Sequence, residues 1–149
     1  MLYPSFSQST NDSNLDNFIL NNPIVYPIAG APISLVIAAY NPGVFRTDTL
    51  MLFITTMSTV ITAIYPRGDV RFRRGERIDF AYKSLGLLVI DTSETAHGLT
   101  YFKVGTVAKG LGQFVEQYGY FYLGFEIREA GVGKIGMGRM YMRYAMRKS

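Results

Sequence analysis

The sequence predicts a single α+β domain built on a mainly antiparallel sheet, with one or two helices and a flexible N-terminal arm. Apolar residues make up 48% of the 149-residue chain, and its aromatic residues, 14% of the total, are all Tyr and Phe, which fit the pleated surface of a sheet. Several short segments alternate apolar and polar residues as half-buried strands do. A chain of this length can bury about 68–70% of its unfolded surface around one core. We therefore expect one domain.

The chain divides into an arm, residues 1–22, and a globular β-rich domain, residues 23–149. The arm is rich in Ser, Asn, Asp and Gln, so it cannot bury enough apolar surface to order itself alone. It lacks a basic start followed by an apolar core, so no secretory signal is expected. Short apolar anchors lie within or beside it, and we expect them to dock into a neighbouring copy of the chain. These anchors are Tyr3, Pro4, Phe6, Tyr26 and Pro27.

A buried strand is predicted at residues 33–40, where the run ISLVIAAY is apolar throughout, and Asn41-Pro42-Gly43 supplies turn residues that end it. The uncharged stretch at residues 49–66 fits either a helix or a strand, and we favour the helix. Its β-branched residues also suit a strand, but strict alternation is missing. A third of the stretch carries hydroxyl groups, which argues against a membrane span.

As a helix, the stretch has an apolar face that can pack on a sheet, with Thr55, Thr59 and Thr62 opposite. Thr47 or Asp48 is expected to cap its first turn, and Pro66 to end it. The apolar face comprises Leu50, Phe53, Ile54, Met57, Ile61 and Ile64.

The remaining elements are predicted to be strands. Alternation around residues 70–72 and 78–82 predicts two short strands joined at residues 74–76, and residues 85–90 a buried strand followed by a polar, solvated loop at 91–98. Residues 100–108 are expected to be extended and to lead into a glycine-spaced loop. Residues 120–129 alternate most regularly, and residues 139–147 are expected to form a strand with a basic face. Gly131 and Gly133 are expected to form the hairpin between these last two strands.

No set of residues predicts catalysis or a bound cofactor. The chain has no cysteine and one histidine, His97, so neither a thiolate site nor a multi-histidine metal site can form within it. The G-x-G-x-x-G spacing of residues 131–136 lacks the strand that should follow in a dinucleotide site. Asp91-Thr92-Ser93 resembles the aspartic-protease signature, but Ser93 replaces the usual Gly and a single Asp would require a homodimer. We expect no enzyme, no metal, no cofactor and no small-molecule substrate.

Positive charge is concentrated in the second half of the chain. Residues 1–65 hold one cation and three carboxylates, so residues 66–149 carry a net charge of +6. Arginine binds phosphate well because its planar fork donates two parallel hydrogen bonds. We predict a basic patch that contacts a membrane surface or a nucleic acid. The patch comprises Arg67, Arg71, Arg73, Arg74, Arg77, Lys134, Arg139, Arg143, Arg147 and Lys148.

Two stretches carry a resemblance to a known family. ISLVIAAYNPGVFRTDTL, followed by an apolar helix, resembles the core of rhabdovirus matrix proteins, in which a strand, an Asn/Pro/Phe-Arg turn and a helix occur in that order. GYFYLGFEIREAGVGKIGMGRMYM resembles the later strands of the same proteins. The ending GRMYMRYAMRKS is separately similar to the final strand of single jelly-roll capsid proteins. The chain lacks the lysine-rich arm and the Pro-Pro-x-Tyr motif of the matrix family.

The matrix resemblance implies a non-enzymatic, self-assembling viral structural protein that links an anionic membrane surface to the nucleocapsid. Its partners would be further copies of itself, the membrane, and the viral nucleocapsid or RNA. It would be found in the virion, the host cytoplasm and at the inner face of the membrane. Two alternatives stay open: a single jelly-roll capsid protein that binds RNA, and a dimeric aspartic-type protease that uses Asp91.

Overall fold

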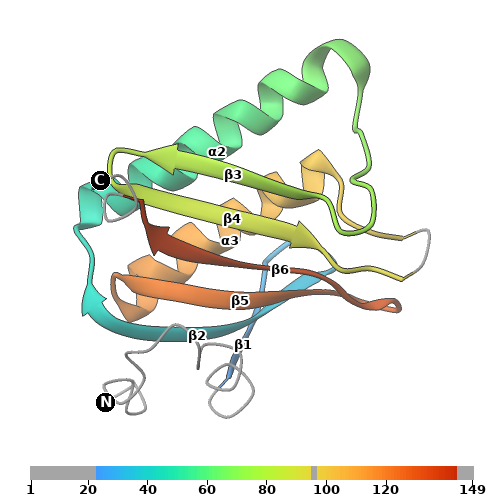
Figure 1. Ribbon diagram of the computed structural model, residues 1–149. Helices are drawn as coiled ribbons and strands as arrows, with labels where there is room; N and C mark the ends of the chain where they lie inside the picture. Colours follow the sequence, from blue (N-terminus) through green and yellow to red (C-terminus); the bar gives the residue numbers. More distant parts are fainter. Residues whose placement is uncertain (1–22, 95–96, 144–149) are drawn as a thin grey trace.

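The computed structural model describes residues 23–94 and 97–143, which form one antiparallel sheet of six strands with two helices packed on one of its faces (Figure 1). This confirms the predicted α+β class. The sheet has the strand order β1-β2-β5-β6-β4-β3. Along the chain the elements are β1 (Ile24–Pro27), β2 (Ile33–Gly43), α2 (Arg46–Arg67), β3 (Arg77–Tyr82), β4 (Leu85–Asp91), α3 (Tyr101–Tyr118), β5 (Phe121–Glu129) and β6 (Gly133–Met142).

The alternation of β5 assigns the two faces of the sheet. Leu123, Phe125 and Ile127 are fully buried beneath the helices, as the sequence predicts. Glu126 and Arg128 lie on the other side, which we call the open face. Cross-strand partners share a face, so the register of β2 and β6 against β5 places the side chains of every central strand.

The inner face of β6 carries no side chain at two successive inward positions, Gly136 and Gly138. A Cβ on Gly138 would lie 2.6 Å from Cζ of Phe125, and a Cβ on Gly136 would lie 2.7 Å from Cδ1 of Leu99. Phe125 and Leu99 are both buried completely. The two glycines therefore make the room in which these larger side chains pack.

The predicted helix is confirmed as α2, but its buried face differs from the predicted one. Leu52, Phe53 and Val60 are buried, whereas Ile54 is 51% and Ile61 64% exposed. The buried face also includes two threonines, 49 and 56, whose hydroxyls donate to backbone carbonyls four residues earlier at 2.8 and 2.9 Å. A threonine bonded in this way can be buried without an unpaired polar group, so hydrophobicity alone assigns the wrong face.

The ends of α2 also differ from prediction. Its N-cap is Phe45, without a side-chain hydrogen bond, and the helix continues through Pro66 to Arg67, with Gly68 at the C-cap. Among the described residues, α2 is the one helix long and apolar enough, by length and composition, to cross a membrane. Here it packs on α3 and the sheet.

The second helix, α3, corrects the prediction of an extended segment and a glycine-spaced loop at residues 100–118. Thr100 caps it by accepting a hydrogen bond from the backbone N–H of Lys103. The glycines that suggested a loop lie where α3 meets its neighbours: a Cβ on Gly105 would come within 3.3 Å of Val60, and one on Gly112 within 3.8 Å of Phe53. Small residues at these positions let the two helices approach each other closely.

Three shorter predictions are also corrected. Residues 41–43 belong to β2, which continues past a register shift after Tyr40, and they do not end it. Of the two strands predicted in residues 70–82, only β3 forms, since Arg71 makes a single bridge to Thr100. The β5–β6 hairpin is confirmed, and Gly131 and Gly133 have the positive φ angles, 80° and 106°, that its turn requires.

Alanine at two α3 glycines should change stability in opposite directions. Gly112→Ala adds a methyl at an ordinary contact distance, so better helix propensity should stabilise the protein by about 0.5–1 kcal/mol. Gly110→Ala should lower the melting temperature, because its Cβ would lie 2.7 Å from Cγ1 of the buried Ile28 and such overpacking costs about 1–3 kcal/mol. Thermal unfolding followed by circular dichroism checks both. Equal shifts in the two variants would contradict the packing described for α3.

Candidate functional site

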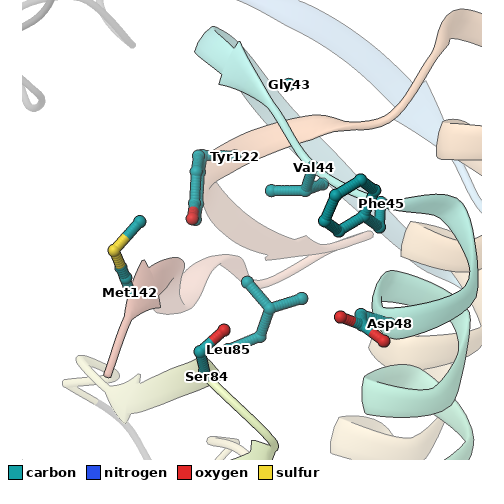
Figure 2. A pocket seen from close by; sticks show the side chains of 8 residues that line it. All are labelled: Gly43, Val44, Phe45, Asp48, Ser84, Leu85, Tyr122 and Met142. Carbon is teal, nitrogen blue, oxygen red and sulfur yellow. The ribbon is translucent and has the colours of Figure 1, made fainter. Parts of the chain in front are cut away.

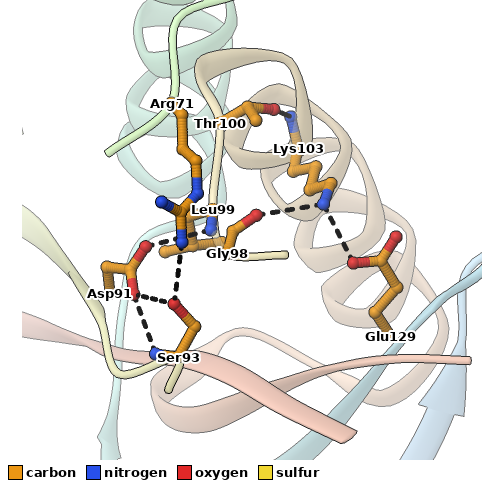
Figure 3. Close-up of polar contacts among 8 residues, drawn as sticks. All are labelled: Arg71, Asp91, Ser93, Gly98, Leu99, Thr100, Lys103 and Glu129. Carbon is orange, nitrogen blue, oxygen red and sulfur yellow. Dashed lines mark hydrogen bonds and ion pairs between the residues drawn. The ribbon is translucent and has the colours of Figure 1, made fainter. Parts of the chain in front are cut away.

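The loop after β4 is organised by Asp91, which is buried at 1% exposure (Figure 3). Its Oδ1 accepts hydrogen bonds from the backbone N–H of Ser93 at 2.8 Å and from the Ser93 hydroxyl at 2.7 Å, and its Oδ2 accepts one from the backbone N–H of Leu99 at 3.0 Å. Arg71 donates to the Ser93 hydroxyl at 3.4 Å. The prediction of a solvated loop is therefore wrong for Asp91 and Ser93.

This arrangement gives Asp91 a structural role. Three donors from its own chain occupy both carboxylate oxygens, and a Cβ at Gly98 would lie 2.7 Å from Oδ2, which shows how closely the returning chain covers the carboxylate. The bonds join the end of β4 to the segment that leads into α3. Neither carboxylate oxygen is left exposed for a substrate, so the geometry gives the protease alternative no support.

A partly buried ion pair lies beside this loop and was not found from the sequence. Lys103, in the first turn of α3, lies 2.9 Å from Glu129 at the end of β5, with 22% and 17% of the two side chains exposed. The same ammonium donates to the carbonyl of Gly98 at 3.0 Å. Lys103 therefore holds α3 to the sheet and is not part of the basic surface.

Five exposed cations gather at the end of the sheet where β3 begins and where β5 and β6 meet. Arg73 and Arg74 lie in the turn before β3, and Arg77 is its first residue. Lys134 stands opposite Arg128 on the open face. Arg74 and Lys134 line one depression of about 530 Å³. We call this group the basic end; it comprises Arg73, Arg74, Arg77, Arg128 and Lys134.

Carboxylates reduce the charge of the basic end without cancelling it. Glu94 pairs with Arg74 at 3.6 Å and Glu126 with Arg128 at 3.3 Å, while Glu76 accepts a hydrogen bond from the backbone of Arg73. The first pair is largely exposed and contributes little to stability. Five cations and these three carboxylates leave the basic end net positive.

The other predicted cations are dispersed. Arg71 belongs to the Asp91 loop, Arg139 lies in the middle of the open face, and Arg143 lies past the far end of β6, where it donates to the carbonyl of Lys83. Arg67 is the last residue of α2. Arg147 and Lys148 lie outside the described residues. Arg128 was missing from the predicted patch, because its position on the face shared with Lys134 depends on strand register.

The outer surface of the helix layer carries several exposed apolar side chains among polar ones. Of the described large apolar residues that are exposed, most lie on the helices or at the N-cap of α2, whereas few lie on the sheet. Ile54, Ile61 and Tyr65 follow one side of α2, and Tyr65 is 88% exposed. Phe102 adds to this surface at the start of α3, where its backbone N–H donates to Asp69 at 2.9 Å.

A shallow groove of about 760 Å³ crosses the helix layer. Leu50, Ile54 and Met57 form its apolar wall on α2, while α3 contributes the polar side chains of Lys109, Gln113 and Gln117. Tyr26, one of the predicted anchors, lies at its edge and packs edge-on against Phe114 at 5.4 Å. Burial and the neighbouring Tyr118 raise the pKa of Tyr26, so its phenol is neutral at neutral pH.

The anchors Tyr26 and Pro27 are thus part of β1. Tyr3, Pro4 and Phe6 lie outside the described residues.

A further cavity of about 400 Å³ lies at the opposite end of the sheet (Figure 2). It is lined by apolar side chains that include Phe45, Leu85 and Met142, and Asp48 is the one charged residue in its lining. Burial raises the pKa of Tyr122, which also faces it, so this phenol too stays protonated at neutral pH. No group of His, Cys, Asp or Glu side chains in the described ranges could hold a metal ion.

Comparisons with protein families, with curated proteins and with solved structures find no match for this chain.

The structural role of Asp91 can be tested directly. Asp91→Asn replaces one acceptor oxygen by a donor and leaves a buried N–H or hydroxyl unpaired, so it should destabilise the protein by about 2–3 kcal/mol. Glu94→Gln, an exposed change three residues away, should stay within about 0.5 kcal/mol of the wild type. Urea unfolding monitored by tyrosine fluorescence gives both values. An Asp91→Asn variant of normal stability that had lost a pepstatin-sensitive peptidase activity would instead support the protease alternative.

Proposed function

We propose that this chain is a non-enzymatic, self-assembling structural protein of matrix type, which lies on an anionic membrane surface and links it to a nucleocapsid. The observation that carries the proposal is the separation of two surfaces. The basic end lies at one end of the sheet, whereas most of the exposed large apolar side chains of the described residues lie on the helix layer. A protein that joins a charged surface to further protein needs two such faces.

The binding free energy expected from the basic end is that of a peripheral membrane protein. Each Lys or Arg close to an anionic leaflet contributes about 1 kcal/mol, so five cations opposed by three carboxylates contribute about 2–5 kcal/mol. A single copy would then bind weakly and reversibly. Many copies in a layer would bind firmly, because the attachment of one copy raises the effective concentration of the next.

The helix layer supports self-assembly. Ile54, Ile61 and Phe102 expose more than half of their side-chain surface, and exposed apolar patches on a folded domain commonly mark sites of protein association. Covering them with another copy would remove apolar surface from water, which is the main driving force for association.

The described fold gives the capsid alternative no support. A jelly roll packs two sheets face to face, whereas the described residues form one sheet covered by helices. RNA is the other candidate anionic partner, and vesicle binding in the presence of RNA distinguishes the two.

Neutralising the basic end should weaken membrane binding. Arg77→Gln with Lys134→Gln removes two cations that form no ion pair with another described residue, which should weaken membrane binding by about 2 kcal/mol, or about thirtyfold in affinity. Sedimentation with vesicles of phosphatidylcholine and 30% phosphatidylserine at low salt measures the change. The matched control is Lys83→Gln with Arg143→Gln, which alters the net charge equally at the other end of the sheet and likewise breaks no ion pair among the described residues.

The control separates local contact from overall charge. If it loses as much binding as the first variant, or if binding ignores the phosphatidylserine fraction, the basic end is not the membrane contact. If single-stranded RNA displaces the protein from the vesicles at equal phosphate concentration, nucleic acid is the preferred partner and the membrane proposal is wrong.

A further inference from the structure

The groove across the helix layer has the chemistry of a receptor for an extended, apolar peptide. One wall presents Leu50, Ile54 and Met57, and Ile54 is half exposed. The opposite wall presents Gln113 and Gln117, whose amides can both donate to and accept from a peptide backbone. The base of the groove is formed by the small residues Ala108 and Gly112, and larger side chains at these positions would fill the groove.

The chain itself carries a segment that matches this groove. Residues 2–6, Leu-Tyr-Pro-Ser-Phe, hold three large apolar side chains and no charge. Pro4 has a fixed φ and favours an extended conformation in the residue before it, so less conformational entropy is lost on docking. An extended segment leaves its backbone N–H and C=O groups without partners, and the two glutamines of the groove can supply them.

The position and length of the intervening chain allow this segment to reach another molecule. Residues 7–23 separate Phe6 from the start of β1, and Tyr26 of β1 already lies at the edge of the groove. A chain of that length spans at most about 55–60 Å. The radius of gyration of the domain is about 14 Å by comparison, so the segment can extend to the groove of an adjoining copy.

Charge favours the same contact. Residues 1–22 contain Asp12 and Asp16 and no Lys or Arg, so the arm is acidic while the rest of the chain is strongly basic. Lys109 lies exposed on the groove wall. The carboxylate of Glu116, which would repel the arm, is held by Arg46 at 3.2 Å and by the hydroxyl of Tyr120.

We propose that residues 2–6 of one copy bind in the α2–α3 groove of the next. This inference rests on the proposed self-assembly and names its contact. When the arm and the groove of one copy engage two different neighbours, the interface is head-to-tail and yields rings or open chains, whereas two copies that exchanged arms would close as a dimer. A layer built of such chains can grow in a way that a closed two-fold dimer cannot.

Variants on each side of the contact test it. Tyr3→Ser with Phe6→Ser removes the apolar side chains of the arm, and Ile54→Gln places an amide in the groove wall at an exposed position. Each should weaken self-association at least about tenfold, as measured by sedimentation velocity over a range of concentrations. The controls are Phe18→Ser, elsewhere in the arm, and Val132→Gln, an exposed apolar residue of the β5–β6 turn outside the groove lining; both should associate like the wild type.

A mixture of the two defective proteins gives a sharper result. The arm variant keeps its groove and the Ile54→Gln variant keeps its arm, so together they should form one-to-one dimers that do not grow further. Because the chain has no native cysteine, Phe6→Cys in one protein and Ile54→Cys in another should form a single disulfide on mixing under mild oxidation. A chain that carries both cysteines should form linked multimers.

Each other outcome identifies what is wrong. A disulfide that forms only within the doubly substituted chain, with no cross-linked multimers, shows that the arm folds back on its own groove and overturns the proposal. Unchanged association of the arm and groove variants shows that the contact lies elsewhere, while the proposed function stands. A wild-type protein that stays monomeric at high concentration and low salt defeats the proposed self-assembly itself.

Discussion

The packing of this domain depends on two adjacent inward positions of β6 that carry no side chain. Gly136 and Gly138 leave a space in the middle of the sheet, which Phe125 enters from β5 and Leu99 from the segment before α3. Leu99 is in turn held by its backbone N–H to the buried carboxylate of Asp91. Two glycines of β6 thus help to fix where the second helix begins. A methyl group at either glycine would push apart the sheet, the Asp91 loop and α3 together, because protein interiors are close-packed and transmit such strain.

The fold class and most of the strands could be predicted, because they follow from a local pattern. Alternation in residues 120–129 assigns the faces of β5 correctly, and the uncharged stretch before Pro66 is the helix that its composition favours. α3 could not be predicted from its composition, since Gly105, Gly110 and Gly112 usually weaken a helix. These glycines favour the fold because Ile28, Val60 and Phe53 pack in the space beside them, which the sequence of α3 alone does not reveal.

The candidate surfaces, too, could be predicted only in part from local sequence patterns. Charge counting found the basic character of the second half of the chain, but register decides which cations stand together. Arg128 joins Lys134 through the β5–β6 pairing, and Arg71 turns instead toward Ser93. The exposure of Ile54 in the groove wall could not be predicted for a similar reason, because Thr49 and Thr56 occupy buried positions of α2 while Ile54 faces outward. Which cations lie together and which side of α2 is exposed depend on residues far apart in the sequence, so no single segment predicts them.

The two margins of the sheet limit how copies can join. The edge strand β1 is only four residues long and ends in Pro27, which has no backbone N–H to donate. The other edge strand, β3, carries the charged residues Arg77 and Asp79. Short strands, prolines and charges are the features that stop sheets from adding strands of other molecules. Copies of this chain must therefore meet through side chains rather than through a continuous backbone ladder. Contacts of that kind respond to salt and concentration, so an assembly built from them can be taken apart again, which a cross-β fibre resists.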